Sequence, residues 1–594
     1  MSNMTRAEAI AALTAIGQPY ELEQVDDHGR RVRMFKNAPR SLRELYAGTI
    51  SDKPFIFYQD EQLTFADAYQ RAAQIAHVLV HDYGIVKGDR VAISMRNYPE
   101  WILAFTAITS IGAIAVAMNS LWQPDEMGYG LSDSGAKVLF ADRERLNRLA
   151  RCTTQISGLK VIAVRPETAQ ASTATRSADV GSAAPELGQL LARVGAVAMP
   201  EVSIAPTDPA TIFYTSGSTG NPKGVVSSHR NILAALLSWE LDGLAHEMVT
   251  GVTSPAATEQ IGTLLAVPLF HATGSHAVYL MSYRLQRRLV CMHKWDPQQA
   301  AELIDSQRLS SFIAPAAMTG DLVRAARQMG RNLSTLAAIG GGGAPRAPEQ
   351  VRQIDATFAQ AMPATGWGMT ETNAIGTGIG GPDYLRRPAS SGRCSAVLEL
   401  KIVDDNGRAL PVSERGELLV RGTSVFAGYW NQPELNATLF DDGWFRTGDV
   451  AYLDDEGFLF IVDRIKDLII RGGENIGCGH VEAALLMHPD VDEAAVYSVP
   501  DERLGEEVGA TIYGSKRLNE TELRAFLSQH LARFELPRYI HQAAGPLPRT
   551  PSGKVLKRQL REQAVAALAS NQLASNQLAS NQLTLNPSTS NKGE

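Results

Sequence analysis

One stretch of the sequence carries most of the information about fold and chemistry: Tyr214-Thr-Ser-Gly-Ser-Thr-Gly-Asn-Pro-Lys-Gly224, which follows the apolar run Ala210-Thr-Ile-Phe213. The apolar run is typical of a buried strand. The stretch after it has three glycines, which let the backbone approach a polyanion closely, and four Ser and Thr hydroxyls that can donate hydrogen bonds. We therefore predict a loop that binds phosphate groups through Thr215, Ser216, Gly217, Ser218, Thr219, Gly220 and the positive charge of Lys223.

Other motifs that use similar residues are excluded. A Walker A loop needs Ser or Thr after its lysine, and here Gly224 follows Lys223. A serine-hydrolase elbow centred on Ser218 needs glycine two residues earlier, where this chain has serine. The segment Gly376-Thr-Gly-Ile-Gly-Gly381 matches the dinucleotide-binding pattern, but Pro382-Asp383 follows it instead of an evident helix. We expect a simple loop there.

The composition is that of a large globular protein. The 594 residues are 44% hydrophobic and 20% charged, which supplies apolar mass for several domains and excludes a chain that is disordered as a whole. The formal net charge of −7, without long basic runs, argues against a nucleic-acid partner. The four cysteines form no C-x-x-C pair, and the N-terminal segment has no continuous apolar run. We therefore expect neither disulfides nor a secretory signal, and a cytoplasmic location.

One apolar segment requires a test for a membrane span. The run from Trp101 to Met118 has no charged residue and reaches the length of a spanning helix. However, Pro99-Glu100 is typical of a helix start and Gly112 of a helix end, so that the remaining Ala113–Met118 is interpreted as a buried strand. We predict no transmembrane segment and leave peripheral contact with a membrane open.

Strands and helices alternate along the first part of the chain. A helix is predicted over 64–83, where Thr64 and Asp67 have the spacing of a capping box. Short buried strands are predicted at 90–94, 138–140 and 160–164. This alternation predicts a mainly parallel sheet covered on both faces. Residues 165–205 are rich in Ala, Ser and Thr and are expected to form an exposed, mobile insertion.

The pattern changes toward the C-terminal end. Short strands and turns follow Gly416, and a compact α+β piece, with a helix over 520–531, begins near Asp463. The sequence Leu-Ala-Ser-Asn-Gln is repeated from residue 568 to 582 with a period that fits neither helix nor strand, so we predict a disordered tail. The predicted divisions are 1–462, 463–565 and 566–594.

Further motifs follow the phosphate loop in a fixed order. They are Pro268-Leu-Phe-His-Ala-Thr-Gly274, Gly341-Gly-Gly-Ala-Pro345, Gly366-Trp-Gly-Met-Thr-Glu-Thr372, Gly416-Glu-Leu-Leu-Val-Arg-Gly422, Trp444-Phe-Arg-Thr-Gly-Asp449, Asp463-Arg-Ile-Lys-Asp-Leu-Ile469 and Pro548-Arg-Thr-Pro-Ser-Gly-Lys554. Together with the loop, this set resembles the adenylate-forming (AMP-binding) superfamily, and its acyl-CoA synthetase or fatty-acid–CoA ligase type. The resemblance implies an α/β fold: a large N-terminal domain of layered α/β subdomains plus a β-rich subdomain, and a small mobile C-terminal α+β domain.

The resemblance also implies a nucleotide site. Lys223 and the loop amides would hold the β- and γ-phosphates, Thr370 would contact the α-phosphate, and Glu371 would bind Mg²⁺, which prefers hard oxygen donors. Asp449 would accept hydrogen bonds from the ribose hydroxyls, with Arg464 nearby. The residues implied to lie against the adenosine are Gly343, Ala344, Pro345, Gly366, Trp367 and Gly368.

The remaining motifs imply the catalytic and moving parts. Lys554 would be the catalytic lysine, and His271 would lie beside the substrate carboxylate. Lys466 matches the hinge of the small domain, and Gly472, Gly473 and Glu474 match the loop that lines the CoA tunnel. This chain departs from the family pattern at Gly477-Cys-Gly-His480, where we expect a looser loop with Cys478 as a buried small residue.

We therefore predict an acyl-CoA synthetase with ATP, Mg²⁺ and CoA as cofactor and co-substrates. A medium- or long-chain fatty acid is the preferred substrate, by analogy with the family. An aryl or hydroxycinnamate acid is the alternative, as is transfer to a carrier protein, and the superfamily also includes luciferase-like oxygenases. A nucleotide-binding regulator without catalysis is disfavoured, because Lys554, Glu371 and Asp449 are all present. The chain could form a homodimer.

Overall fold

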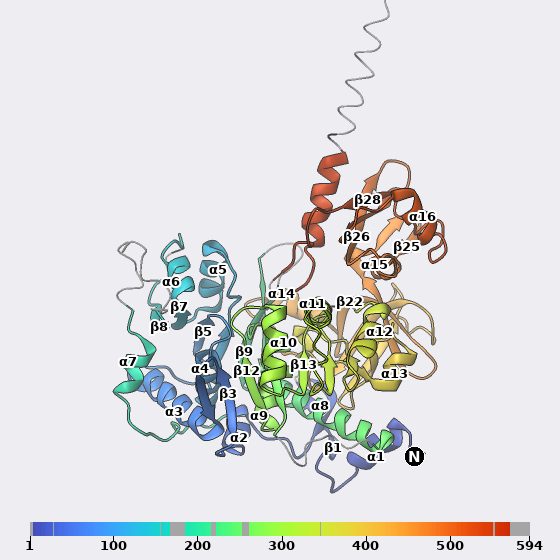
Figure 1. Ribbon diagram of the computed structural model, residues 1–594. Helices are drawn as coiled ribbons and strands as arrows, with labels where there is room; N and C mark the ends of the chain where they lie inside the picture. Colours follow the sequence, from blue (N-terminus) through green and yellow to red (C-terminus); the bar gives the residue numbers. More distant parts are fainter. Residues whose placement is uncertain are drawn as a thin grey trace, which may run out of the picture. The chain divides into compact units, whose positions relative to one another are not determined.

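The computed structural model describes residues 4–27, 29–154, 156–166, 184–215, 221–251, 260–344, 346–550, 553–568 and 570 (Figure 1). The chain divides into two compact units. The first comprises Met1–Arg346, Gln350–Thr447 and Ala451–Ile461, and the second Ala347–Glu349, Gly448–Val450 and Val462–Glu594. Each unit has its own hydrophobic core.

The first unit contains a seven-stranded sheet. Its strands, in order, are β20 (Gly428–Tyr429), β10 (Lys223–Ser228), β9 (Pro209–Thr215), β6 (Ile114–Ala117), β5 (Arg90–Ser94), β7 (Val138–Asp142) and β8 (Lys160–Val164). The five strands from β9 to β8 are parallel, whereas β10 pairs antiparallel with both β9 and β20. Alternate residues enter two different cores, with Val91 and Ile93 in one and Ala92 in the other. The sheet is therefore buried on both faces, as predicted.

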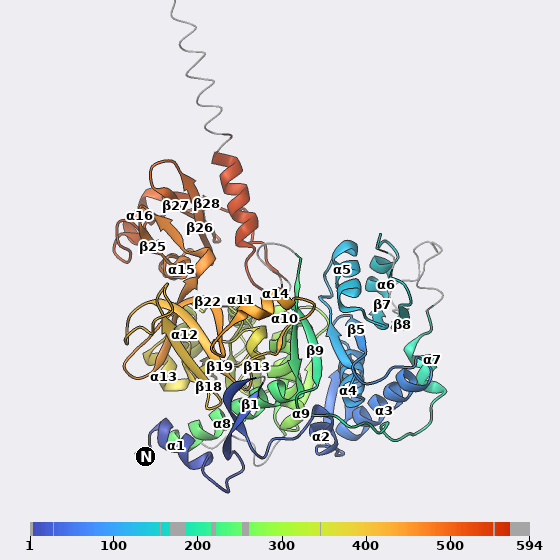
Figure 2. The ribbon, with the colours of Figure 1, turned by 180° about the vertical axis from the view of Figure 1, so that it is seen from behind.

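Helices α3 (Phe65–His81) and α4 (Pro99–Ser110) pack against each other in this unit (Figure 2). The predicted capping box is confirmed, because Thr64 accepts from the backbone of Asp67 and Asp67 accepts from the backbone of Thr64. The charge-free run predicted to form a helix and a strand does so, as α4 and β6. Among the described helices, none combines the length and the apolar character that crossing a membrane requires.

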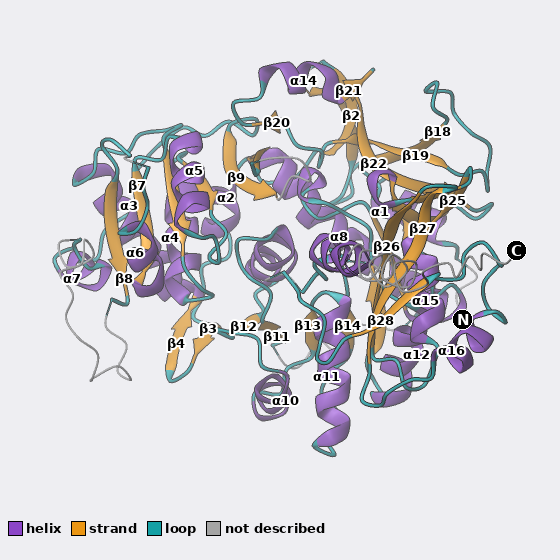
Figure 3. Cartoon of the chain, turned by 90° about the horizontal axis from the view of Figure 1, so that it is seen from above, coloured by secondary structure: helices purple, strands orange, loops and turns teal. Residues whose placement is uncertain are grey.

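A second, larger sheet continues the first unit. Its parallel part consists of β3 (Pro54–Tyr58), β12 (Arg288–Cys291), β11 (Gly262–Leu265), β13 (Ser311–Ile313), β14 (Ala338–Gly340) and β15 (Met362–Thr365), with β4 (Glu61–Thr64) antiparallel at the edge. Figure 3 shows helix α8 (His229–Thr250) on one side of this row, and α10 (Pro297–Ser306) and α11 (Ala316–Gln328) on the other. The chain thus forms α/β layers here too.

The same sheet then becomes antiparallel and β-rich. This part consists of β16 (Thr377–Gly380), β17 (Gly392–Cys394), β23 (Phe458–Arg464), β22 (Trp444–Leu453), β19 (Gly416–Gly422) and β18 (Leu398–Val403), and β21 (Phe440–Asp441) pairs with β22. The predicted fold class, layered α/β subdomains followed by a β-rich subdomain, is confirmed for the first unit.

The second unit is the expected small α+β piece. Its sheet has the order β25 (Glu474–Ile476), β24 (Ile469–Arg471), β27 (Gly505–Tyr513) and β26 (Glu493–Asp501), and β28 (Tyr539–Gln542) pairs with β27. Helices α15 (Cys478–Leu486) and α16 (Glu520–Leu527) contribute Val481 and Leu523 to its core. Residues 557–568 are also helical. Of the repeats, residue 569 and residues 571–582 lie outside the described residues, as does the rest of the tail.

Near the start of the chain, β1 (Leu22–Asp27) and β2 (Arg30–Phe35) form a separate two-stranded antiparallel sheet. The remaining described elements are α1 (Arg6–Leu13), α2 (Leu42–Ala47), α5 (Pro124–Ser134), α6 (Arg143–Leu149), α7 (Leu187–Ala192), η3 (Thr273–Leu280), α9 (Met281–Arg284), α12 (Pro348–Thr357), η4 (Thr370–Thr372), α13 (Gly381–Arg386), α14 (Pro433–Leu439) and η5 (Ile465–Asp467).

Several sequence predictions were wrong. The glycine-rich segment at 376–381 is not a loop: it forms β16 and leads into α13, whose first turn contains Pro382, a position that proline tolerates. Because β16 pairs antiparallel with β15 and β17, the dinucleotide-binding context is still missing.

Two further predictions were wrong in part. The segment 165–205 is not wholly an exposed insertion, because Leu187 and Leu190 of α7 are buried against the core, while residues 167–183 lie outside the described residues. Helix α16 ends at Leu527 rather than at residue 531, although Leu531 still packs into the core. Apolar spacing therefore continues beyond the helix.

Candidate functional site

The phosphate motif forms a β-hairpin. Thr215 at the end of β9 and Lys223 at the start of β10 are register partners, and the Thr215 hydroxyl donates to the carbonyl of Lys223 at 3.4 Å. The residues between them that sequence analysis assigned to phosphate binding, Ser216, Gly217, Ser218, Thr219 and Gly220, lie outside the described residues. The hairpin brings the two described ends of the motif together.

A second motif meets this hairpin through an aromatic side chain. Glu371, within η4, is 6% exposed and accepts a hydrogen bond from the hydroxyl of Tyr429 on Oε1 at 2.8 Å. The Nζ of Lys223 lies 5.4 Å from the centroid of the Tyr429 ring, within cation–π range. The sequence analysis missed Tyr429, whose only signal is an aromatic residue after Gly428.

The segment predicted to lie against adenine follows β14. Gly343 has a φ of +76°, which favours glycine, and a Cβ on Gly341 would lie 2.5 Å from Nη2 of Arg346. Arg346 is buried and donates to the carbonyls of Ala364 and Gly340, at 3.2 and 3.4 Å. Burial lowers the pKa of the Arg346 guanidinium. Ala344 is described next to Gly343, whereas Pro345 lies outside the described residues.

Two glycines of the next motif are required by close backbone packing. A Cβ on Gly366 would lie 2.3 Å from the carbonyl oxygen of Thr377, and one on Gly368 would lie 2.5 Å from that of Ala374. Trp367 between them is buried and accepts from the amide of Thr377 at 3.0 Å. Gly366, Trp367 and Gly368 thus hold the segment that leads into Thr370 and Glu371.

The buried His276 hydrogen-bonds Asn373, two residues after Glu371. His276 hydrogen-bonds Asn373 Oδ1 through Nε2 at 3.2 Å and Ser275 Oγ through Nδ1 at 2.8 Å. It lies in η3, a π-helix, a rare form that is frequently found at functional sites. Burial lowers the pKa of His276 to about 4, so the ring is neutral near pH 7. His271, the predicted histidine, precedes η3, and its ring is tilted by 45° against that of Phe270 with ring centroids 4.5 Å apart.

The second unit contains the other predicted residues. Asp449 is 3% exposed, and its Oδ1 pairs with Nε of Arg464 at 2.6 Å. Lys466 is exposed in η5. Gly472 and Gly473 form the two-residue turn between β24 and β25, with φ of +60° and +94°, a conformation typical of tight hairpins.

Glu474, at the start of β25, is exposed. The departure from the family pattern does not loosen the chain as predicted. Cys478 begins helix α15, its amide donates to Oδ2 of Asp463 at 2.6 Å, and its side chain is 1% exposed. Burial raises the pKa of the Cys478 thiol, so it stays protonated. Cys478 is therefore the buried small residue that the sequence suggested.

Lys554 lies on a braced loop. Its amide donates to the hydroxyl of Thr550 at 3.1 Å, and its own side chain is exposed. Arg549 donates through Nη1 to the carbonyl of Gly553 at 2.9 Å and pairs through Nη2 with Glu493 at 2.8 Å. Glu493 is 8% exposed, so this pair is held inside the unit. These contacts fix the backbone of the loop near Thr550 and at Gly553.

The described residues can be compared with the ligands that Mg²⁺ requires. Within the described residues there is no group of three or more His, Cys, Asp or Glu side chains arranged to hold a metal. Mg²⁺ usually needs no such cage, because it keeps several waters and binds one or two carboxylates plus substrate phosphates. The buried carboxylate of Glu371, which contacts Tyr429 near the hairpin predicted to bind phosphate, fits this pattern.

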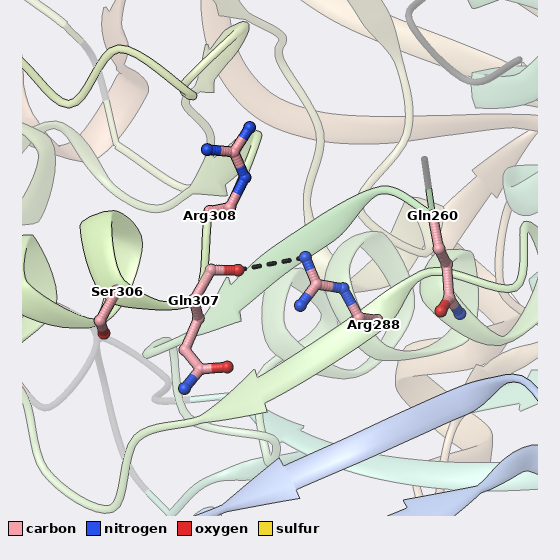
Figure 4. Close-up of a pocket in the computed structure, with 5 residues that line it drawn as sticks. All are labelled: Gln260, Arg288, Ser306, Gln307 and Arg308. Atoms are coloured by element: carbon pink, nitrogen blue, oxygen red, sulfur yellow. Dashed lines mark hydrogen bonds between the residues drawn. The ribbon is translucent and has the colours of Figure 1, made fainter. Parts of the chain in front are cut away.

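A separate pocket of about 370 Å³ is lined by residues that lie at or just before the amino ends of the parallel strands β11, β12 and β13 (Figure 4). Nη2 of Arg288 donates there to the carbonyl of Gln307 at 3.1 Å. The residues that line it, all outside the motifs described above, are Gln260, Arg288, Ser306, Gln307 and Arg308.

The comparisons with known proteins agree with this arrangement. Residues 44–430 match the AMP-binding enzyme family, and residues 480–554 match the AMP-binding enzyme C-terminal domain. The chain therefore belongs to this family, and it is an ATP-dependent acid–thiol ligase of the AMP-forming kind. Enzymes of this class use ATP, Mg²⁺ and CoA.

The relatives of this chain are named for different acids. The chain is 32% identical to the long-chain-fatty-acid–CoA ligase FadD13 of Mycobacterium tuberculosis, over 86% of this chain and 94% of that protein. It is 34% identical to the 2-succinylbenzoate–CoA ligase of Geobacillus kaustophilus, over 84% and 92%. The structure of O-succinylbenzoate coenzyme A synthetase (MenE) from Bacillus subtilis with ATP and magnesium has a TM-score of 0.72 and 27% identity, covering 88% of this chain and 99% of that one. An acyl- or aryl-CoA ligase activity follows, without a particular acid.

Proposed function

We propose that this chain joins a carboxylic acid to ATP, forming acyl-AMP and pyrophosphate, and then transfers the acyl group to the thiol of CoA, releasing AMP. The preferred acid is a fatty acid of medium or long chain. The observation that carries the proposal is the meeting of Lys223 and Glu371 on Tyr429. A cation suited to the β- and γ-phosphates and a carboxylate suited to Mg²⁺ share one aromatic side chain.

In the first half-reaction a carboxylate oxygen attacks the α-phosphorus, and the bond to pyrophosphate breaks. Both reactants are anions, so the residues of the site must offset negative charge. Lys223 holds the outer phosphates and Thr370 contacts the α-phosphate. Mg²⁺, when bound at Glu371, supplies additional charge neutralisation. Lys554 adds a positive charge as charge builds up in the transition state, where it raises the rate most.

The adenosine is assigned to two glycine-containing segments and to the carboxylate of Asp449. The segment of Gly343, Ala344 and Pro345 and the segment of Gly366, Trp367 and Gly368 would bind the base. Asp449 would accept from both ribose hydroxyls, and its pairing with Arg464 keeps its carboxylate oriented.

In the second half-reaction the CoA sulfur attacks the acyl carbon, the thiol proton is lost, and AMP leaves. Lys466 would serve as the hinge between the two half-reactions. The turn of Gly472, Gly473 and Glu474 would line the path of the pantetheine arm. His271 would lie beside the substrate carboxylate in the first step.

The class of acid rests on similarity. The relative FadD13 is named for long-chain fatty acids, which supports our preference. An aromatic acid is the second candidate, supported by the slightly higher identity to the 2-succinylbenzoate–CoA ligase. We also propose a cytoplasmic location, supported by the free thiols of all four cysteines.

A panel of acids would test the function. Pyrophosphate release would be measured with fatty acids of six to eighteen carbons, with hydroxycinnamates and with 2-succinylbenzoate, each with and without CoA. We expect the highest kcat/KM for a fatty acid, and a thioester only when CoA is present. A higher kcat/KM for an aromatic acid would replace our preference, and pyrophosphate release with no CoA thioester would indicate a different acceptor.

A further inference from the structure

We propose that Tyr429 is a positioning residue that holds the carboxylate of Glu371 beside the ammonium of Lys223, and thereby sets the affinity of this protein for ATP in its magnesium form. The inference rests on the proposed function, since it assumes that ATP binds at this site. It assigns a task to a side chain that lies outside the predicted motifs.

The geometry connects two opposite charges through one ring. The hydroxyl of Tyr429 donates to Oε1 of Glu371 at 2.8 Å, while the ring face lies 5.4 Å from Nζ of Lys223. Because the Glu371 side chain is almost fully buried, its carboxylate needs hydrogen-bond donors to offset its desolvation. The phenol supplies one such donor without bringing a second charge into the site.

The backbone of Tyr429 is itself anchored on several sides. Its amide donates to Oδ1 of Asn436, and Nδ2 of Asn436 donates back to its carbonyl, both at 2.7 Å. Tyr429 is the register partner of Val225 in β10, and the amide of the next residue, Trp430, donates to the carbonyl of Gly224 at 2.7 Å. The ring is therefore held against the strand that begins at Lys223.

The Glu371 turn is also tied to the same segment. The amide of Phe426 donates to the carbonyl of Glu371 at 2.8 Å, and Nδ2 of Asn373 donates to the carbonyl of Ser424 at 2.9 Å. The hydroxyl of Tyr429 thus fixes the carboxylate of Glu371, whose backbone these hydrogen bonds already hold in place. A carboxylate that is oriented before the metal arrives loses less freedom on binding.

The test is Tyr429→Phe, which keeps the ring face and removes only the hydroxyl. The dissociation constants of ATP with excess Mg²⁺ and of ATP with EDTA would be measured by calorimetry on the same preparation. We expect the first to rise about tenfold and the second to change less than twofold, because the lost hydrogen bond acts on Glu371. The Mg²⁺ concentration for half-maximal pyrophosphate release should rise, with an unchanged KM for the acid.

The controls separate positioning from general damage. Tyr452, which stacks on Phe460, provides a matched Tyr452→Phe variant that should change neither constant. Glu371→Gln, which removes the charge of the carboxylate itself, should show at least the loss of Tyr429→Phe, and the double variant should lose little more than Glu371→Gln. The ratio of the two dissociation constants is insensitive to the fraction of protein that has failed to fold.

Three outcomes would overturn the inference: an unchanged ratio, an equal weakening with and without Mg²⁺, or additive losses in the double variant. They are distinguishable from failure of the proposed function, in which the unmodified protein would bind no ATP under either condition.

Discussion

Replacing Lys554 by alanine should separate the two half-reactions. The side chain is exposed and its loop is held by backbone bonds to Thr550 and by Arg549, so its removal leaves no cavity and breaks none of these bonds. The free energy of unfolding should therefore change by less than about 0.5 kcal/mol. If the ammonium stabilises charge in the transition state, its loss should cost ~3–4 kcal/mol, as for comparable electrostatic groups. At about 1.4 kcal/mol per tenfold change, acyl-AMP formation should slow by roughly two to three orders of magnitude.

The assay measures each step separately. Acyl-AMP formation is followed as pyrophosphate release from acid and ATP, and thioester formation is followed from synthetic acyl-AMP and CoA. We expect the second rate to stay within about twofold, because the leaving group is already good and no charge builds up on phosphorus. Lys516→Ala, at an exposed lysine of the same unit, is the matched control. An equal loss in both steps would refute the reasoning. Lys466→Pro should slow thioester formation and spare acyl-AMP formation, because proline restricts the backbone of the proposed hinge.

The other predictions concern nucleotide binding, the loop brace and acid stability. Lys223→Ala should weaken ATP binding by ~1.5–3 kcal/mol through the loss of a charge-assisted contact, and an unchanged dissociation constant would remove Lys223 from the site. Arg549→Ala should slow acyl-AMP formation but not thioester formation, with partial recovery in Arg549→Lys, because the arginine fixes the carbonyl of Gly553 against Glu493; a loss in both steps would indicate a structural role only. Burial lowers the pKa of His229 and His276 to about 4 from an ordinary 6.5, so the unfolded chain takes up protons first as the pH falls. Stability should decrease by about 2 kcal/mol per histidine between pH 7 and pH 5, and a urea midpoint that does not decrease over this range would contradict the expectation.

Local patterns accounted for much of the fold. The predicted strand at 160–164 matches β8, and Thr64 and Asp67 form the expected cap, because both depend on residues close together in the sequence. The segment at 376–381 was interpreted wrongly because Pro382 was taken as excluding a helix, although proline fits the first turn. Its identity as a strand depends on pairing with β15 and β17, which no local pattern reports.

The sequence alone determined which charged residue types could be proposed for the reaction: a lysine after a glycine-rich loop, an acidic residue within Gly366–Thr372 and a lysine near the C-terminal end. Only the tertiary structure decided which side chains orient them. Tyr429 reaches Glu371 across 58 positions of the chain, and His276 reaches Asn373 across 97. Such contacts depend on strand order and register, which bring segments that are distant in the sequence next to each other. A linear pattern therefore identifies the groups that carry charge, but not the neutral groups that hold them in place.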